Sequence, residues 1–171
     1  MQNCLGLFKR QQNLRELLVR ARVARKETPY PRRQQRGMKK CGTNCTACPH
    51  ILEAKSVKIN GIPWNINRNF NCKSYNVVYA ISCNKDRCKQ TYIGETKKIV
   101  KYRLDEHRGY VNNLVDTATG SHYTLPGHSL ADLELIVLEQ TRYKNDSYRK
   151  EREVYYIREF NTVHNGLNRK I

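Results

Sequence analysis

Acidic residues and long apolar runs are both scarce in this chain of 171 residues. Only 15 Asp and Glu oppose 32 Lys and Arg, which gives a formal net charge of +17. No run approaches the roughly 18 apolar residues that a transmembrane helix needs, so we expect no membrane partner. The N-terminus has only a short apolar patch over residues 4–8 and lacks the pattern of a secretory signal. We therefore expect an intracellular protein whose cysteines stay reduced.

The excess of positive charge is concentrated near the N-terminus. Residues 1–40 carry twelve Lys and Arg against two Glu, a net charge of +10. Apolar spacing predicts a short basic helix over 13–26, followed by a flexible basic linker. So much unopposed charge favours a polyanionic partner, most simply nucleic acid. The candidate contacts in the linker are Arg32, Arg33, Arg36, Lys39 and Lys40. This run is also typical of a nuclear-import signal, which predicts a nuclear protein, or it is a solvated tail without a partner.

Two further regions follow the basic N-terminal region. Residues 41–74 are rich in Cys, Gly and Pro and show little periodicity, so we expect this segment to need a metal or a disulfide for stability. Residues 75–171 have the pattern of a compact α/β domain. The predicted elements are strands at 75–82, 91–94 and 133–139, helices at 97–112 and 146–161, and a loop at 116–129.

The first group of cysteines has the spacing of a structural zinc site. Cys41, Cys45 and Cys48 lie within eight residues, so one turn can point all three sulfurs inward. Cys72 would complete the tetrahedron that structural zinc requires. His50 competes with Cys72 for the fourth position.

A second set combines two cysteines with two histidines. Cys83 and Cys88 flank a strand-to-strand turn, and His122 and His128 lie in a loop with Gly and Pro. Two thiolates and two imidazoles also suit tetrahedral zinc. Together the two zinc sites leave only Cys4 unassigned. Disulfides are the alternative, which the expected reducing compartment opposes.

The order of motifs in the second half of the chain resembles the GIY-YIG nuclease family. Tyr79 ends a Val-Val-Tyr motif, and a Tyr-Ile-Gly motif runs from Tyr92 to Gly94. An arginine and a glutamate follow on two predicted helices, and a Gly-Leu-Asn motif lies near the end of the sequence. The cysteines around these motifs, and the upstream stretch NLRELLVRAR, are similar to the endonuclease of Penelope-like retroelements. Two features depart from the family pattern: the first motif keeps only its tyrosine, and the cysteine pair lengthens the gap between the tyrosines.

The resemblance implies an α/β (α+β) fold with a small, mainly antiparallel three-stranded sheet flanked by helices. It implies a DNA endonuclease that uses Mg²⁺ or Mn²⁺. In the full element a reverse transcriptase would lie upstream, and the nick made by the endonuclease would prime reverse transcription. Gly94 would let the backbone approach the phosphate. A single site predicts nicking, and a double-strand break would take two sites. The catalytic residues that it implies are Tyr79, Tyr92, Arg103, His107, Glu153 and Asn168.

These residue types suit phosphodiester cleavage. A carboxylate can hold Mg²⁺, an arginine offers a planar fork to phosphate oxygens, and a tyrosine beside a cation can relay a proton if its pKa is lowered. His107 lies one helical turn after Arg103, where it would act as general base or phosphate donor, or would fill space in the core. Glu153 is favoured over Glu151 for the metal because its position puts it on the inward face of the last helix. A surface ion pair with Arg149 or Arg158 is the alternative for Glu153.

Two other functions compete with the retroelement nuclease. One is a zinc-stabilised DNA-binding module that has lost catalysis. The other is a cellular repair nuclease of the same fold with a preference for branched DNA. The complete set of catalytic residue types favours an active enzyme, and the cysteine pair between the tyrosine motifs favours the retroelement type.

Overall fold

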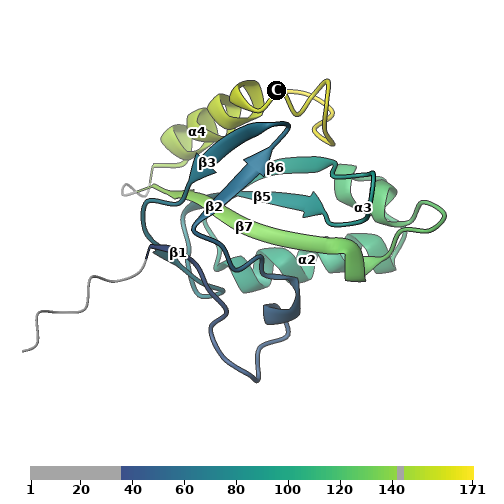
Figure 1. Cartoon of the computed structure of the whole chain (residues 1–171), viewed down its shortest axis with the longest axis horizontal. Coiled ribbons are helices and arrows are strands. Elements are labelled where there is room, and N and C mark those ends of the chain that lie inside the picture. The colour runs from purple at the N-terminus through teal and green to yellow at the C-terminus, as the bar shows by residue number, and fades with distance from the viewer. Residues whose placement is uncertain (1–35, 142–144) are drawn as a thin grey trace, which may run out of the picture. The chain divides into compact units, whose positions relative to one another are not determined.

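The computed structural model describes residues 36–141 and 145–171. The helix predicted over 13–26, together with Arg32 and Arg33, lies outside these residues. The centre of the molecule is a three-stranded antiparallel sheet of β5 (Val77–Cys83), β6 (Thr91–Thr96) and β7 (Leu133–Gln140), in the order β6-β5-β7 (Figure 1). The prediction of an α/β fold with a small antiparallel sheet is confirmed.

Strand register determines which side chains share a face of this sheet. Tyr79 on β5 pairs with Gly94 on β6, and Val78 pairs with Glu95 on one side and Glu139 on the other. Since side chains alternate along a strand, Tyr79 faces one layer, while Glu95 and Glu139 face the other. β5 is buried almost throughout because both faces are covered, which explains its continuous apolar sequence.

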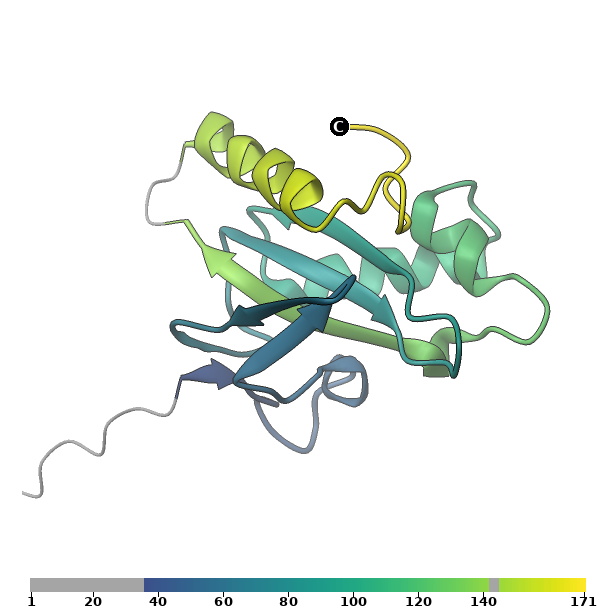
Figure 2. The ribbon, with the colours of Figure 1, turned by 45° about the horizontal axis from the view of Figure 1, so that its top comes forward.

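Two helices cover the sheet. Helix α2 (Val100–Asn112) lies behind it in Figure 2, and α4 (Asp146–Glu159) packs in front, mainly against β6. Both helices follow the predicted ranges within a few residues. Among the described residues, no helix has the length and apolar content needed to cross a bilayer.

The segment predicted as a loop at 116–129 contains a short helix, so that prediction is wrong in part. Helix α3 spans Ala118–Tyr123, and the Thr117 side chain caps it by accepting a hydrogen bond from the Gly120 amide. A 3₁₀ turn, η2 (Leu130–Asp132), then leads into β7. Six residues are too few to show helical periodicity, and this helix forms because Tyr123 and its neighbours are buried.

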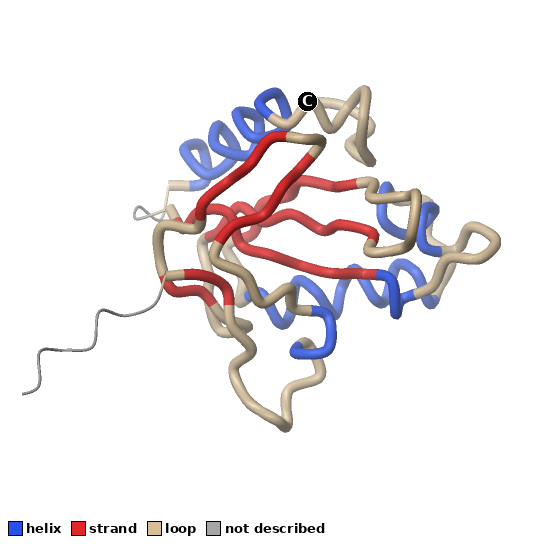
Figure 3. The backbone as a smooth tube through the Cα atoms, in the orientation of Figure 1, coloured by secondary structure: helices blue, strands red, loops and turns tan. Residues whose placement is uncertain are grey.

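The cysteine-rich segment folds as part of the same compact unit as the three-stranded sheet. It consists of β1 (Gly37–Met38) paired in parallel with β4 (Asn69–Phe70), the 3₁₀ turn η1 (Cys48–His50) and a hairpin of β2 (Ser56–Ile59) and β3 (Ile62–Asn65) (Figure 3). Met38, from the segment predicted as the basic linker, is buried in the core. Trp64 on β3 contacts the rings of Tyr156 and Phe160, which joins the hairpin to α4.

Candidate active site and zinc sites

Two tyrosines and a glycine form the centre of the candidate active site. The rings of Tyr79 and Tyr92 lie on one face of the sheet, with centroids 6.5 Å apart. A Cβ atom at Gly94 would lie 2.7 Å from both the Tyr79 hydroxyl and Cε1 of Tyr92. The glycine is therefore needed to make room for the two rings. The expected approach of the phosphate to the Gly94 backbone stays a prediction.

Helix α2 brings Arg103 against the Tyr79 hydroxyl. Arg103 Nε donates a hydrogen bond of 2.8 Å to that oxygen, and Nη1 donates one of 2.7 Å to Glu106. Glu106 is also paired with Lys98. Arg103 also interacts with the Tyr92 hydroxyl, and 22% of its side chain is exposed. A partly exposed guanidinium held in this way can present a positive charge to an anion such as a phosphate oxygen.

His107 is buried behind Tyr79 and is only 2% exposed. Its Nε2 lies 2.8 Å from the Tyr79 hydroxyl, and its Nδ1 lies 2.9 Å from the Thr119 hydroxyl. Burial, followed by the charge of Arg103, lowers the pKa of His107 to about 3, so the ring is neutral. The imidazole therefore orients Tyr79 from the core side and does not reach the solvent. This position favours a positioning role over the predicted roles of general base or phosphate donor.

Burial also determines the protonation of both tyrosines. It raises the pKa of Tyr79 and of Tyr92, and it outweighs the nearby positive charge of Arg103. Both hydroxyls are therefore protonated at neutral pH, and a lowered tyrosine pKa beside a bound cation stays a prediction. Tyr79 is fully buried, whereas Tyr92 remains partly exposed. Of the two, Tyr92 is the tyrosine that can contact a substrate.

Glu153 on α4 reaches the β6 edge of the sheet. Burial, followed by the negative charge of Glu95, raises the pKa of Glu153 to about 7, while the Glu95 backbone and the charges of Arg103 and Arg149 act in the opposite direction. Arg149 is nearly buried and is paired with Glu95 and Asp146, so the predicted ion pair of Glu153 with Arg149 is absent from the described residues. A partly buried carboxylate without an ion pair is a candidate cation ligand.

The competing carboxylate, Glu151, lies on a different face of α4. It is exposed and lines an outer groove together with Tyr155 and Arg158. The helical spacing that favoured Glu153 from the sequence therefore agrees with the placement in the structure.

Asn168 holds the backbone of β6 between the second tyrosine and the glycine. Its Oδ1 accepts hydrogen bonds from the Ile93 amide at 2.9 Å and the Thr162 hydroxyl at 2.7 Å. Its Nδ2 donates to the Ile93 carbonyl at 2.8 Å. β6 is an edge strand, so this side chain replaces the ladder bonds that a neighbouring strand would provide. Asn168 thus fixes the position of Tyr92 and Gly94.

The first predicted zinc site is assembled in the structure. Sulfurs of Cys41, Cys45, Cys48 and Cys72 all lie within 4.8 Å of one another. The Cys48 sulfur is 3.7 Å from that of Cys41 and 3.5 Å from that of Cys72, close to the roughly 3.8 Å that a tetrahedral zinc with bonds of about 2.3 Å requires. His50 instead places Nδ1 3.2 Å from the Leu133 carbonyl, which favours Cys72 as the fourth ligand.

The second predicted site is assembled from two segments of the chain, the turn between β5 and β6 and residues 122–128. Ligand atoms of Cys83, Cys88, His122 and His128 lie within 4.8 Å of one another. Cys88 Sγ is 3.5 Å from His122 Nε2. Both ring nitrogens of His128 are buried and make no hydrogen bond to the described residues. Buried imidazole nitrogens rarely lack a partner, and a metal ion would provide one. Both clusters can therefore hold zinc, and neither contains a disulfide.

A comparison with protein families identifies the domain that carries this site. The model described as the GIY-YIG catalytic domain matches residues 75–168, more than half of the chain. The chain belongs to the GIY-YIG family. Members of this family are nucleases that hydrolyse phosphodiester bonds with a divalent metal, so this protein is an endonuclease and DNA is its substrate. Searches of curated proteins and of solved structures each gave no match.

Glu153 fits the divalent metal that GIY-YIG nucleases use. Its carboxylate is partly buried, has a raised pKa and lacks an ion pair within the described residues, and it lies beside the exposed edge of β6. Carboxylate oxygen is the ligand type that Mg²⁺ prefers, and a cation there would offset the cost of burying this charge.

The basic contacts predicted in the linker are only partly described. Arg36 and Lys39 are exposed, and Lys40 is paired with Glu53 at 3.9 Å. Their predicted contact with nucleic acid stays a prediction.

The structure adds residues to the site that the sequence did not single out. Thr119 orients His107, Glu106 orients Arg103, and Arg149 holds Glu95 beside Glu153. The sequence offered one signal for Glu95, since this residue directly follows Gly94 of the second tyrosine motif. Thr119 comes from the segment that was expected to be a loop.

Replacing Gly94 with alanine is expected to reduce nicking of plasmid DNA by about 100-fold or more. The added Cβ would displace the Tyr79 ring from Arg103, so the guanidinium of Arg103 would be misplaced in the site. The matched control is Gly109→Ala on α2, where a Cβ meets nothing within 4 Å. That control should keep its activity and gain about 0.5–1 kcal/mol in stability because alanine favours the helix. Equal activity of the two variants would contradict the role of Gly94.

Acid should destabilise the protein through His107. The unfolded imidazole binds a proton near its ordinary pKa, whereas the folded ring resists protonation down to a pKa of about 3. The stability from this group is therefore present above about pH 6.5 and is lost as the pH falls below it, by about 2 kcal/mol between pH 7 and pH 5. Urea unfolding at both pH values measures the loss. His107→Gln should show a smaller loss between the two pH values, and an identical loss in both proteins would assign it to other groups.

Proposed function

We propose that this protein is a Mg²⁺-dependent DNA-nicking endonuclease of the Penelope-like retroelement type, acting in the nucleus. Its nick would free a 3′ end for target-primed reverse transcription by an upstream reverse transcriptase. The observation that carries the catalytic part is the cluster of Tyr79, Tyr92, Arg103 and Glu153 around the β6 edge of a GIY-YIG domain. The retroelement part rests on the order of the cysteines and the two tyrosine motifs.

Each residue of the site has a separate proposed role. Arg103 would bind the scissile phosphate through its partly exposed guanidinium and offset the charge that develops in the transition state. Tyr92, a partly exposed residue with a protonated hydroxyl, would orient the attacking water. Tyr79 and His107 would hold Arg103 in place.

The carboxylate of Glu153 would bind the divalent cation. When bound, Mg²⁺ supplies a Lewis acid next to the phosphate. Asn168 would keep the edge strand in register, so that Tyr92 and the phosphate site stay aligned.

Zinc ions in the two clusters would act structurally. The backbone carbonyl of Cys72 accepts a hydrogen bond of 3.0 Å from the Lys101 amide. The backbone carbonyl of Ser74 accepts one of 2.8 Å from the Val100 amide. These bonds satisfy amides in the first turn of α2, the helix that carries Arg103. The first zinc site would therefore position a catalytic helix as well as stabilise its own segment.

The proposal is tested by incubating supercoiled plasmid with the zinc-loaded protein at modest salt, with and without Mg²⁺. We expect nicked circles that require Mg²⁺. Arg103→Gln should reduce the rate about 100-fold through loss of charge stabilisation. Arg108→Gln is the matched control because it lies on the same helix and pairs with Asp105, away from the site. DNA binding without nicking in Mg²⁺ and in Mn²⁺ would instead support an inactive binding module.

The end groups and the preferred substrate separate the retroelement role from repair. A nick that primes reverse transcription must leave a 3′ hydroxyl that a polymerase can extend, and a 3′ phosphate would exclude that role. Cleavage of branched DNA at a much higher rate than plain duplex would favour a repair nuclease.

A further inference from the structure

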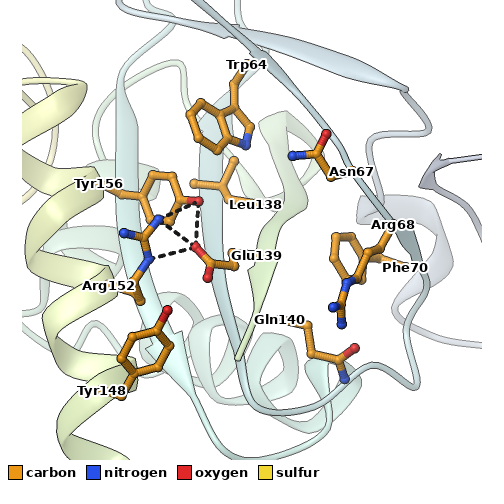
Figure 4. Close-up of a pocket in the computed structure, with 10 residues that line it drawn as sticks. All are labelled: Trp64, Asn67, Arg68, Phe70, Leu138, Glu139, Gln140, Tyr148, Arg152 and Tyr156. Atoms are coloured by element: carbon orange, nitrogen blue, oxygen red, sulfur yellow. Dashed lines mark hydrogen bonds and ion pairs between the residues drawn. The ribbon is translucent and has the colours of Figure 1, made fainter. Parts of the chain in front are cut away.

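A pocket lies on the face of the sheet opposite Tyr79, between the β2–β3 hairpin and α4. Its volume is about 400 Å³, which lies in the range of roughly 300–1,000 Å³ that small-ligand sites occupy. Four aromatic side chains line it: Trp64, Phe70, Tyr148 and Tyr156. In Figure 4, Trp64, Tyr156 and Tyr148 line one side, and Asn67, Arg68 and Phe70 lie opposite. The lining thus combines ring surfaces with polar groups.

One wall of this pocket is held rigidly. Arg152 Nε and the Tyr156 hydroxyl both donate hydrogen bonds of 2.8 Å to Glu139 Oε2 (Figure 4). The Arg152 guanidinium carbon also lies 5.1 Å from the centre of the Tyr156 ring. Trp64 packs edge-to-face with Tyr156, with centroids 5.1 Å apart. Tyr156 itself is buried, so the partly exposed Trp64 and Tyr148 are the rings of this pocket that a planar ligand could contact.

Other polar groups in the pocket lack partners. The Trp64 indole nitrogen is buried and makes no hydrogen bond to a described residue. Arg68 lines the pocket, and its guanidinium has no hydrogen bond or ion pair within the described part of the chain. Since Glu139 is shared by Arg152 and Tyr156, the charge of Arg68 remains unopposed. The pocket therefore suits a planar ligand that carries a negative charge.

The pocket is close to the candidate active site. Val78 on β5 pairs with Glu95 beside the active site and with Glu139 in the pocket wall. Two strand spacings separate these glutamates, about 10 Å at the level of the backbone. That separation corresponds to about three steps of a stacked DNA strand, and to fewer steps of an unstacked one. One bound DNA strand could occupy both sites.

We propose that this pocket binds one unstacked nucleotide of the DNA substrate, with its base against the aromatic rings and its phosphate at Arg68. This inference rests on the proposed function, because it takes DNA as the substrate. A base that is paired and stacked in a duplex cannot enter the pocket, so the nuclease would prefer DNA with unpaired nucleotides near the cleavage site. Stacking on aromatic side chains is tolerant of base identity, so little sequence preference is expected from this pocket.

Trp64 provides a direct probe, because it is the single tryptophan of the chain. The zinc-loaded full chain is titrated, without added Mg²⁺, with two labelled DNAs. One is a blunt duplex, and the other carries a short single-stranded tail containing 5-bromodeoxyuridine, whose base quenches indole emission on contact. Tryptophan emission reports occupancy of the pocket, and anisotropy of the labelled DNA reports total binding.

The tailed DNA is expected to quench Trp64 emission by more than half, while the blunt duplex leaves it unchanged. The double variant Arg68→Gln/Tyr148→Ala should bind the tailed DNA about tenfold more weakly, the loss expected from one base stack, and the blunt duplex as before. The matched control for the lost charge is Arg158→Gln, at an exposed position on the outer face of α4. The control should bind both DNAs like the wild type.

Three results would overturn the inference. The first is unchanged Trp64 emission when anisotropy shows that the tailed DNA is bound. The second is equal binding of the tailed DNA by the pocket variant and the control. The third is equally tight quenching by free 5-bromodeoxyuridine monophosphate, which would make the ligand a free nucleotide and not part of a strand. Plasmid nicking measured in parallel separates this inference from the proposed function. Nicking without quenching of Trp64 would reject only the nucleotide pocket. Quenching without nicking would reject only the proposed nuclease activity.

Discussion

Glu153→Ala is expected to lower the rate of plasmid nicking by about 1,000-fold in saturating Mg²⁺, since loss of a metal ligand removes several kcal/mol of charge stabilisation in the transition state. Glu153 is the partly buried carboxylate beside Arg103 and the edge of β6. Removing its charge also relieves repulsion with Glu95, so the folded protein should not lose stability. Rates from gel densitometry and the melting temperature, measured together, test both expectations.

Glu151→Ala is the matched control for this experiment. It changes the same charge on the same helix two residues earlier, at an exposed position away from the sheet. Nicking by this variant should remain within about twofold of the wild type, because surface substitutions away from a site have small effects. If Glu151→Ala lost activity while Glu153→Ala kept it, the metal carboxylate would be assigned to the wrong residue.

Cys72→Ser is expected to remove one of two bound zinc ions and to lower the melting temperature by on the order of 10 °C. Zinc binding supplies much of the folding free energy of small metal-bound segments, and each kcal/mol corresponds to a few degrees in a domain of this size. The Cys72 carbonyl also holds the first turn of α2, so nicking should fall as well. Elemental analysis of the purified protein and thermal unfolding give the two measurements.

Two controls separate the zinc ligands from other candidates. His50→Gln should keep both zinc ions, because His50 contacts the Leu133 carbonyl and is not among the grouped ligands. Cys4→Ser should also keep both, because Cys4 is the cysteine that the sequence assigns to neither site. Two zinc ions retained by Cys72→Ser, with one lost in His50→Gln, would reverse the assignment of the fourth ligand.

The main elements of the nuclease domain were predictable because their sequences repeat with a clear period. β5 is a continuous apolar run because it is buried on both faces, and α2 and α4 carry apolar stripes at helical spacing. Helix α3 was missed because one and a half turns give no such period, and because burial of its side chains depends on neighbours far away in the sequence.

The sequence by itself determined the residue types and spacings of this protein: the cysteine and histidine groups, the two tyrosine motifs and the large positive charge. Only the tertiary structure decided what each group does in its surroundings. Burial makes His107 a neutral support for Tyr79, the contact between two rings requires Gly94, and Asn168 completes an edge strand from 75 residues away. Exposure, protonation and strand register depend on which distant segments pack together, and local spacing along a chain does not contain that information.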